Sequence, residues 1–157
     1  MTLRTATHFV SLFVLLALTS GCGGGAKETN AAGGTPAAGA ANVSKYDAGP
    51  RAGEQPIDEH LAKSGEQLFK DKGCSACHAF GAKLSGPDLK GVSMRRTALW
   101  MENQILHPEV MVKEDPISRE MFAKYALQMT NQHLTPPEAK AVIEYLKHQD
   151  HEQTEVH

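Results

Sequence analysis

Three side chains near the middle of the chain, Cys74, Cys77 and His78, form a C-x-x-C-H sequence. This is the attachment sequence for c-type haem. The spacing suits that chemistry, because two thiols add to the two vinyl groups along one porphyrin edge while the adjacent imidazole is held within reach of the iron. The sequence therefore predicts one covalently bound haem c with His78 as an axial ligand.

Three other uses of this cysteine pair are weaker. A thioredoxin-like redox pair needs a flanking βαβ pattern, which the sequence lacks. A structural zinc site needs four nitrogen or sulfur ligands, and no second cysteine pair follows the first. A structural disulfide would close a very small loop and leave the adjacent His78 unexplained.

The third cysteine, Cys22, follows the layout of a secretory signal. Arg4 gives a positive start, residues 9–18 are an apolar run, and small residues precede Cys22. The run is too short for a helix to cross ~30 Å of hydrocarbon. Residues 18–22 resemble a bacterial lipobox, which implies that Cys22 is lipidated and anchors the mature protein to a bacterial membrane on its periplasmic side. The alternative is an ordinary cleaved signal with a free Cys22.

Length and charge limit what the remaining chain can be. The 157 residues allow one domain of ordinary size, and the formal net charge of -2 is unlike the basic surface that nucleic-acid binding needs. Residues 23–42 contain six Gly and seven Ala and no large apolar side chain, so they predict a disordered tether. We divide the chain into a signal peptide (1–21), a lipidated N-terminus with a flexible tether (22–56), a haem domain (57–149) and a polar tail (150–157).

The elements that position the C-x-x-C-H sequence are predicted to be helices. Apolar residues recur at one-face helical spacing over residues 57–71, from Thr97 until Pro108, and again from about Ser118. Thr135 and the prolines and glutamate after it are typical of a helix start. No stretch alternates with period two, so the domain is predicted to be all-α. Its few large apolar side chains would make a thin core, which a haem would fill.

The sequence resembles the class I monohaem c-type cytochromes, in a bacterial lipoprotein form, over roughly residues 57–149. The similarity lies in Gly65 with Phe69, the C-x-x-C-H sequence, residues 86–89 and the final helix. The resemblance implies a cytochrome c fold, with three to five helices wrapped around one haem and the first and last helices crossing at Gly65. It also implies that the Pro87 carbonyl accepts the Nδ1 proton of His78 and that Leu89 packs on the porphyrin.

The second axial ligand is expected to be Met129. A thioether stabilises ferrous iron and raises the potential, and Met129 precedes the last helix, where the family has its ligand loop. Met94 and Met111 are alternatives in predicted loops, whereas methionines on predicted helices more often fill the core. The methionines on predicted helices are Met101 and Met121, and the alternative nitrogen ligands, which would give a bis-His haem of lower potential, are His107 and His133.

Several polar residues have less specific roles. Trp100, Arg95 and Arg96 are candidates to bind the haem propionates, because indole and guanidinium N–H groups suit buried carboxylates; the alternatives are a core tryptophan and a solvated basic corner. The C-terminal histidines are interpreted as a frayed polar end rather than a metal site. These histidines are His148, His151 and His157.

The half of the domain that contains the C-x-x-C-H sequence is positive, and Lys70, Lys72 and Lys83 lie on either side of that sequence. Such charges would steer a redox partner with an acidic surface. A solvated surface without a partner is the alternative. The sequence therefore predicts a tethered electron carrier of respiratory redox proteins, not an enzyme, and the alternative function is a haem-based sensor or ligand-binding domain with a displaceable sixth ligand.

Overall fold

The structure, a computed structural model, describes residues 43–155, and within that range every regular element is a helix. In chain order these are η2 (Ala52–Glu54), α1 (Glu59–Asp71), η3 (Cys74–Ala76), α2 (Val92–Arg95), α3 (Ala98–Leu106), α4 (Pro108–Glu114), α5 (Pro116–Tyr125) and α6 (Pro136–Glu155). The predicted all-α class is confirmed. None of the helices in residues 43–155 combines the length and the apolar character needed to cross a bilayer.

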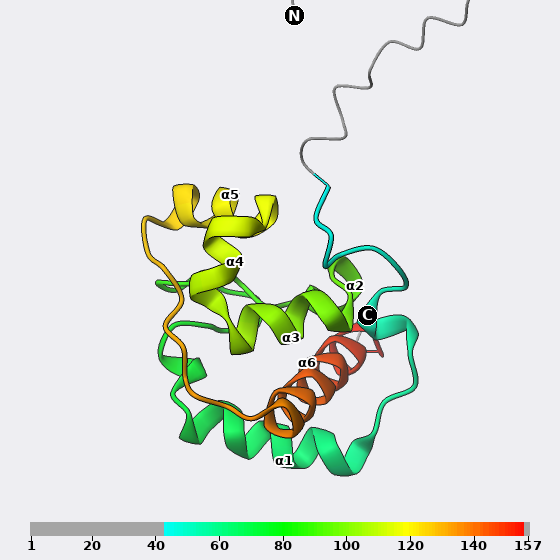
Figure 1. The fold of residues 1–157 in the computed structure, drawn as a ribbon. Helices are drawn as coiled ribbons and strands as arrows, with labels where there is room; N and C mark the ends of the chain where they lie inside the picture. Colours follow the sequence, from blue (N-terminus) through cyan, green and yellow to red (C-terminus); the bar gives the residue numbers. More distant parts are fainter. Residues whose placement is uncertain (1–42, 156–157) are drawn as a thin grey trace, which may run out of the picture. The chain divides into compact units, whose positions relative to one another are not determined.

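The first and last long helices cross, and α6 lies between α1 and α3 (Figure 1). Asp58 caps α1 by accepting hydrogen bonds from the backbone N–H groups of His60 and Leu61, each at 3.0 Å. At the crossing Gly65 is buried, and a Cβ there would overlap the carbonyl group of Ala141. Only glycine lets the two backbones approach this closely. The resemblance implied a crossing at this residue.

Aromatic rings extend the crossing toward the C-x-x-C-H sequence. The centroids of Phe69 and Tyr145 are 5.4 Å apart, and the Phe80 ring lies 5.8 Å from each of them. Tilted and edge-on ring pairs of this kind contribute stability beyond the area that they bury. The cluster therefore fixes α1, α6 and the chain after His78 against one another.

The helices α3, α4 and α5 follow one another through short joints that use prolines. Thr97 caps α3, and the hydroxyl of Thr97 accepts from the N–H of Trp100 at 3.0 Å. The sequence predicted that Pro108 ends this helix and that Met111 lies in a loop. The helix does end before Pro108, at Leu106, but Pro108 also begins α4, because a helix tolerates proline in its first turn. Met111 is therefore a buried residue of α4 and not part of a loop. Pro116 begins α5 in the same way.

Residues 43–56 form a strap that packs on the helices. The prediction of a tether extending to residue 56 is corrected here, because Ala52 is only 1% exposed and its N–H donates to Arg96 O at 3.0 Å. Asp47 accepts from the Thr97 N–H at 2.8 Å, and Lys147 Nζ donates to Pro56 O at 2.7 Å. These contacts join the strap to α3 and α6. Residues 1–42, including Cys22, lie outside the described residues.

The last helix is longer than expected. The prediction of a polar tail from residue 150 is corrected, because α6 continues to Glu155 and Asp150 is buried within it. The Asp150 carboxylate accepts from the backbone N–H groups of Gly91 and Ser93 and from the Ser93 hydroxyl, which anchors the start of α2. His148, 3.3 Å from Glu59, is thus part of a regular helix rather than a frayed end. His157 lies outside the described residues.

Candidate functional site

A cavity of about 320 Å³ opens between the chain that follows α1 and the chain that follows α5. Both connections lie on the same side of the molecule in Figure 1. The walls come mainly from Gly73 and the C-x-x-C-H residues Cys74, Cys77 and His78, from residues 85–89 and 127–130, and from side chains of α3, α5 and α6. Most of the side chains on the walls are apolar, and the C-x-x-C-H residues form part of one wall.

The C-x-x-C-H residues follow a helix stop. Gly73, with φ of 74°, adopts the left-handed conformation that glycine accepts without strain, and the turn η3 begins at Cys74. The N–H of His78 donates to Cys74 O at 3.0 Å, which closes the turn. Both cysteines are partly buried, unpaired and on the cavity wall. The turn therefore presents two free thiols and one imidazole to the same cavity.

Burial raises the pKa of the Cys74 thiol. Reactive cysteines of redox pairs have a lowered pKa and a stabilised thiolate. The direction at Cys74 is the opposite, which argues against a thiol–disulfide exchange role for this pair. In residues 43–155 no group of three or more His, Cys, Asp or Glu side chains gathers where it could hold a metal ion.

The imidazole of His78 is held by the turn at residues 85–87. Its Nδ1 lies 2.9 Å from Pro87 O. Because a carbonyl oxygen only accepts, Nδ1 carries the proton and Nε2 keeps its lone pair for a metal. A Cβ on Gly86 would lie 2.7 Å from His78 Cε1, so glycine lets the turn approach the ring this closely. The contact is the one that the resemblance implied.

Met129 is half-buried and lines the cavity from the connection between α5 and α6. That connection starts where Ala126, with φ of 51°, ends α5 in a left-handed conformation. The Sδ atom of Met129 lies 3.8 Å from the amide nitrogen of Gln104 on α3. Met129 thus reaches the cavity from an irregular segment, and its sulfur is held by a side chain of a helix.

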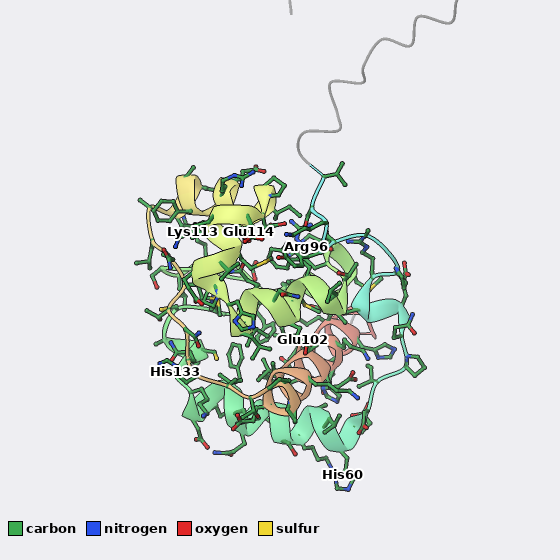
Figure 2. All side chains as sticks on the ribbon, in the orientation of Figure 1. His60, Arg96, Glu102, Lys113, Glu114 and His133 are labelled. Carbon is green, nitrogen blue, oxygen red and sulfur yellow. The ribbon has the colours of Figure 1, made fainter. Side chains whose placement is uncertain are left out.

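The other candidates for a second axial ligand are placed less favourably. Met94 is 55% exposed on α2, and neither it nor the buried Met111 lines the cavity. Met101 on α3 and Met121 on α5 line the cavity, and Met101 is part of the buried core. The alternative nitrogen ligands are His107 and His133, which line a separate depression near the end of α3. Figure 2 shows His133 on the connection that precedes α6.

Trp100, Arg95 and Arg96 were expected near the propionates, and all three line the cavity. Their N–H groups have different partners in the protein. The indole Nε1 of Trp100 donates to Asp115 at 3.0 Å, so the predicted bond from this N–H to a propionate is corrected. The Arg96 guanidinium lies 5.1 Å from the Trp100 ring centroid and pairs with Asp47 at 3.3 Å. Arg95 donates to Lys90 O. Both guanidinium groups retain further N–H donors.

Sequence reasoning missed the buried carboxylate that Trp100 contacts. Asp115 is 1% exposed and caps α5 through the N–H of Ser118 at 2.9 Å. Burial alone would raise the pKa of Asp115, but hydrogen bonds from Ser44, Ser118 and Trp100 outweigh it and hold the pKa below its usual value. An Asp before a proline at a helix start could have indicated the cap, although not its tryptophan partner.

The rim of the cavity combines apolar and positive side chains. Phe122 and Leu127 line the cavity and are 46% and 52% exposed. Beside them Lys83 Nζ lies 4.8 Å and Lys124 Nζ 5.7 Å from the Tyr125 ring centroid. Lys83 was predicted to lie at a docking surface and Lys124 was not. The remaining two predicted lysines are paired with acids: Lys70 with Glu66 at 2.6 Å and Lys72 with Glu138 at 3.7 Å.

Comparisons with known proteins agree with this geometry. The sequence model of the family described as Cytochrome c matches residues 62–150. Cytochrome c-551 of Ectopseudomonas mendocina is 53% identical over 36 residues, which are 23% of this chain and 44% of that protein. Cytochrome c-551 of Stutzerimonas stutzeri is 46% identical over 39 residues, 25% and 38% of the two chains. The matches thus span less than half the length of these relatives.

A solved structure described as a cytochrome c from Rhodothermus marinus shares the fold. It superposes with a TM-score of 0.60 at 36% identity, and the match covers 64% of this chain and 84% of that one. The residues on the cavity wall provide the donor set that a covalently attached haem requires. Two free thiols, an imidazole with a free Nε2 and an apolar cavity lie together.

Proposed function

The chain belongs to the cytochrome c family and binds one haem c covalently, and on that premise we propose that it is a membrane-tethered electron carrier of extracytoplasmic respiratory proteins. The observation that carries the proposal is that the C-x-x-C-H residues and Met129 line the same cavity. When bound, the haem supplies one-electron chemistry between ferrous and ferric iron. The protein supplies the ligands, the apolar surroundings and a docking surface.

Each cavity residue has a proposed task. Cys74 and Cys77 hold the haem through two thioether bonds, and His78 ligates the iron through Nε2 while Pro87 keeps its ring in one tautomer. Leu89 packs on the porphyrin. Met129 is the proposed sixth ligand, and its soft sulfur favours ferrous iron. With both His78 and Met129 bound to the iron, no coordination position would be open to a substrate, which suits a carrier rather than a catalyst.

The propionates are assigned to the two arginines. Arg95 and Arg96 line the cavity, and a guanidinium group can donate to a carboxylate while it keeps another partner. Arg96 is held in place by its stacking on Trp100 and its pairing with Asp47. Trp100 supports this arrangement as a cavity wall and not as a hydrogen-bond donor to the haem.

The docking surface is proposed to be the rim formed by Phe122, Leu127 and the lysines beside Tyr125. Exposed apolar side chains surrounded by positive charge suit a partner with an acidic surface, because the charge raises the encounter rate without making the complex long-lived. Lys83 and Lys124 carry this role better than Lys70 and Lys72, whose charges are offset by neighbouring glutamates.

The tether is proposed to end at a lipidated Cys22. We expect Cys22→Ser to release the protein from membranes into the soluble extracytoplasmic fraction, because the acyl chains that hold a lipoprotein attach to this sulfur and the new N-terminus. The haem spectrum should not change, since Cys22 is not one of the residues that line the haem cavity. Fractionation and mass spectrometry of the mature protein measure both effects. A variant that stays in the membrane fraction would contradict the anchor.

One observation favours the alternative function of a haem sensor: Met129 lies on an irregular connection rather than on a helix. A haem sensor needs a sixth ligand that leaves readily. We expect the ferrous wild-type protein to resist carbon monoxide at concentrations that saturate an open haem, because a firmly held thioether blocks the coordination position. Rapid binding, followed by absorption spectroscopy, would favour the sensor function over the carrier function.

A further inference from the structure

Gln104 on α3 uses both ends of its side-chain amide within the cavity wall. Its nitrogen, Nε2, lies 3.8 Å from Met129 Sδ, and its oxygen, Oε1, accepts a hydrogen bond from Ser118 Oγ at 2.7 Å. Gln104 lines the same cavity as Met129. The amide therefore bridges the proposed sixth ligand and the first turn of α5.

The hydroxyl of Ser118 determines which end of the amide faces the sulfur. This hydroxyl has one proton and two nearby acceptors, Gln104 Oε1 at 2.7 Å and Asp115 Oδ1 at 3.1 Å. Asp115 Oδ1 already accepts from the Ser118 N–H at 2.9 Å and from Trp100 Nε1 at 3.0 Å. The hydroxyl proton therefore goes to Gln104, and the donating end of the amide is directed toward Met129.

Burial makes this orientation costly to reverse. Asp115, Ser118 and Trp100 are 1%, 4% and 4% exposed, whereas Gln104 and Met129 are half-buried, so bulk water does not reach the Ser118 end of this bridge. Rotating the amide would direct its oxygen at the sulfur, where neither atom has a proton to donate. An unsatisfied polar group in a buried network costs more than one that water can reach.

We propose that Gln104 is a positioning residue for the sixth ligand: its N–H holds Met129 Sδ, and the Ser118–Asp115–Trp100 group keeps the N–H directed at the sulfur. The inference rests on the proposed ligation by Met129. A hydrogen bond to the sulfur draws electron density away from it, and ferric iron needs that density more than ferrous iron does. Gln104 thus raises the potential and slows the departure of Met129.

The test compares amide substitutions in the haem-loaded, full-length protein. Gln104→Leu keeps the approximate side-chain volume and removes the N–H, so we expect a lower midpoint potential, a shifted or weakened iron–thioether absorption band and faster binding of carbon monoxide to the ferrous form. The matched control is Asn103→Leu on the same helix. The Asn103 amide donates to Leu99 O on the exposed side, and its loss should change none of the three.

Ser118→Ala provides a second variant that leaves Gln104 itself intact. It removes the hydroxyl that fixes the amide oxygen but keeps the backbone cap on Asp115, so the potential should shift in the same direction by a smaller amount. A purely structural role for Ser118 would lower the unfolding midpoint without moving the potential, which would count against the proposal.

Met129→Ala, measured in the same series, separates this inference from the ligand assignment. If Met129→Ala abolishes the band while Gln104→Leu matches Asn103→Leu in potential and band, Met129 is the ligand and the role of Gln104 is overturned. If the band survives in Met129→Ala, the ligand assignment and the inference fail together. Loss of the band in Met129→Ala with the expected shifts in Gln104→Leu supports both.

Discussion

Protein in which Cys74 and Cys77 are both replaced by alanine is expected to lose all its haem on acid–acetone extraction, whereas the wild type keeps it. Both thiols are unpaired and lie on the cavity wall, and they are the two groups there that can form thioether bonds to the haem vinyl groups. The measurement is haem absorbance in the protein pellet after extraction, made on protein from a host that has haem c maturation machinery.

The third cysteine gives the matched control for this experiment. Cys22→Ser removes a thiol that is not part of the C-x-x-C-H sequence and should retain covalent haem at the wild-type level. The double variant should also have a lower free energy of unfolding, because an unfilled cavity of about 320 Å³ would remain between the helices. Covalent haem that persists in the double variant would overturn the attachment site.

The second large effect is expected at Met129. Met129→Ala should abolish the weak long-wavelength iron–thioether band of the ferric protein, lower the potential and let carbon monoxide bind the ferrous form. The reason is that a soft ligand favouring ferrous iron has been removed from the cavity. Absorption spectroscopy and a potentiometric titration measure these changes, and the fold should persist because Met129 is only half-buried.

Methionines elsewhere provide the controls for that experiment. Met101→Ala should keep the band and cost about 2–5 kcal/mol of stability as a core truncation, since Met101 is 3% exposed. Met121→Ala should keep the band as well. If Met94→Ala or Met111→Ala abolished the band while Met129→Ala kept it, that other methionine would be the ligand, although neither Met94 nor Met111 lines the cavity. Absence of the band in the wild type would point instead to His107 or His133.

Local signals in the sequence predicted much of this fold. The C-x-x-C-H spacing, the Thr97 start of α3 and the Thr135 start of α6 depend only on residues within one or two turns of each other. In the structure Thr135 donates through its N–H and hydroxyl to Glu138 at 2.7 and 2.8 Å, as expected of a helix start with glutamate in its first turn. Such signals are readable because the partners are neighbours in the chain.

Other features could not be predicted because their partners are far apart in the chain. The strap at residues 43–56 looks like a linker by composition, yet Asp47 binds Arg96 and Thr97, about fifty residues away. Asp150 looks like part of a polar tail, yet it binds Ser93. The sequence around a charged residue does not reveal which distant backbone N–H group that residue will bind when it is buried.

Proline was ambiguous for a different reason. Pro108 and Pro116 can each end one helix or begin the next, because a missing N–H is harmless in the first turn. The sequence pattern favoured an end at Pro108, and the structure has both an end and a start there. This placed Met111 inside a helix and removed it from the segments that could supply a ligand.

The crossing of α1 and α6 also sets the order of events as the protein is made. Asp58 and Glu144, which join the start of α1 to α6, are 86 residues apart, so the crossing waits until almost the whole domain has been synthesised. Contacts between such distant residues form slowly, because the loop between them must close first. Until then the C-x-x-C-H thiols lie on an open chain, accessible to the machinery that attaches the haem.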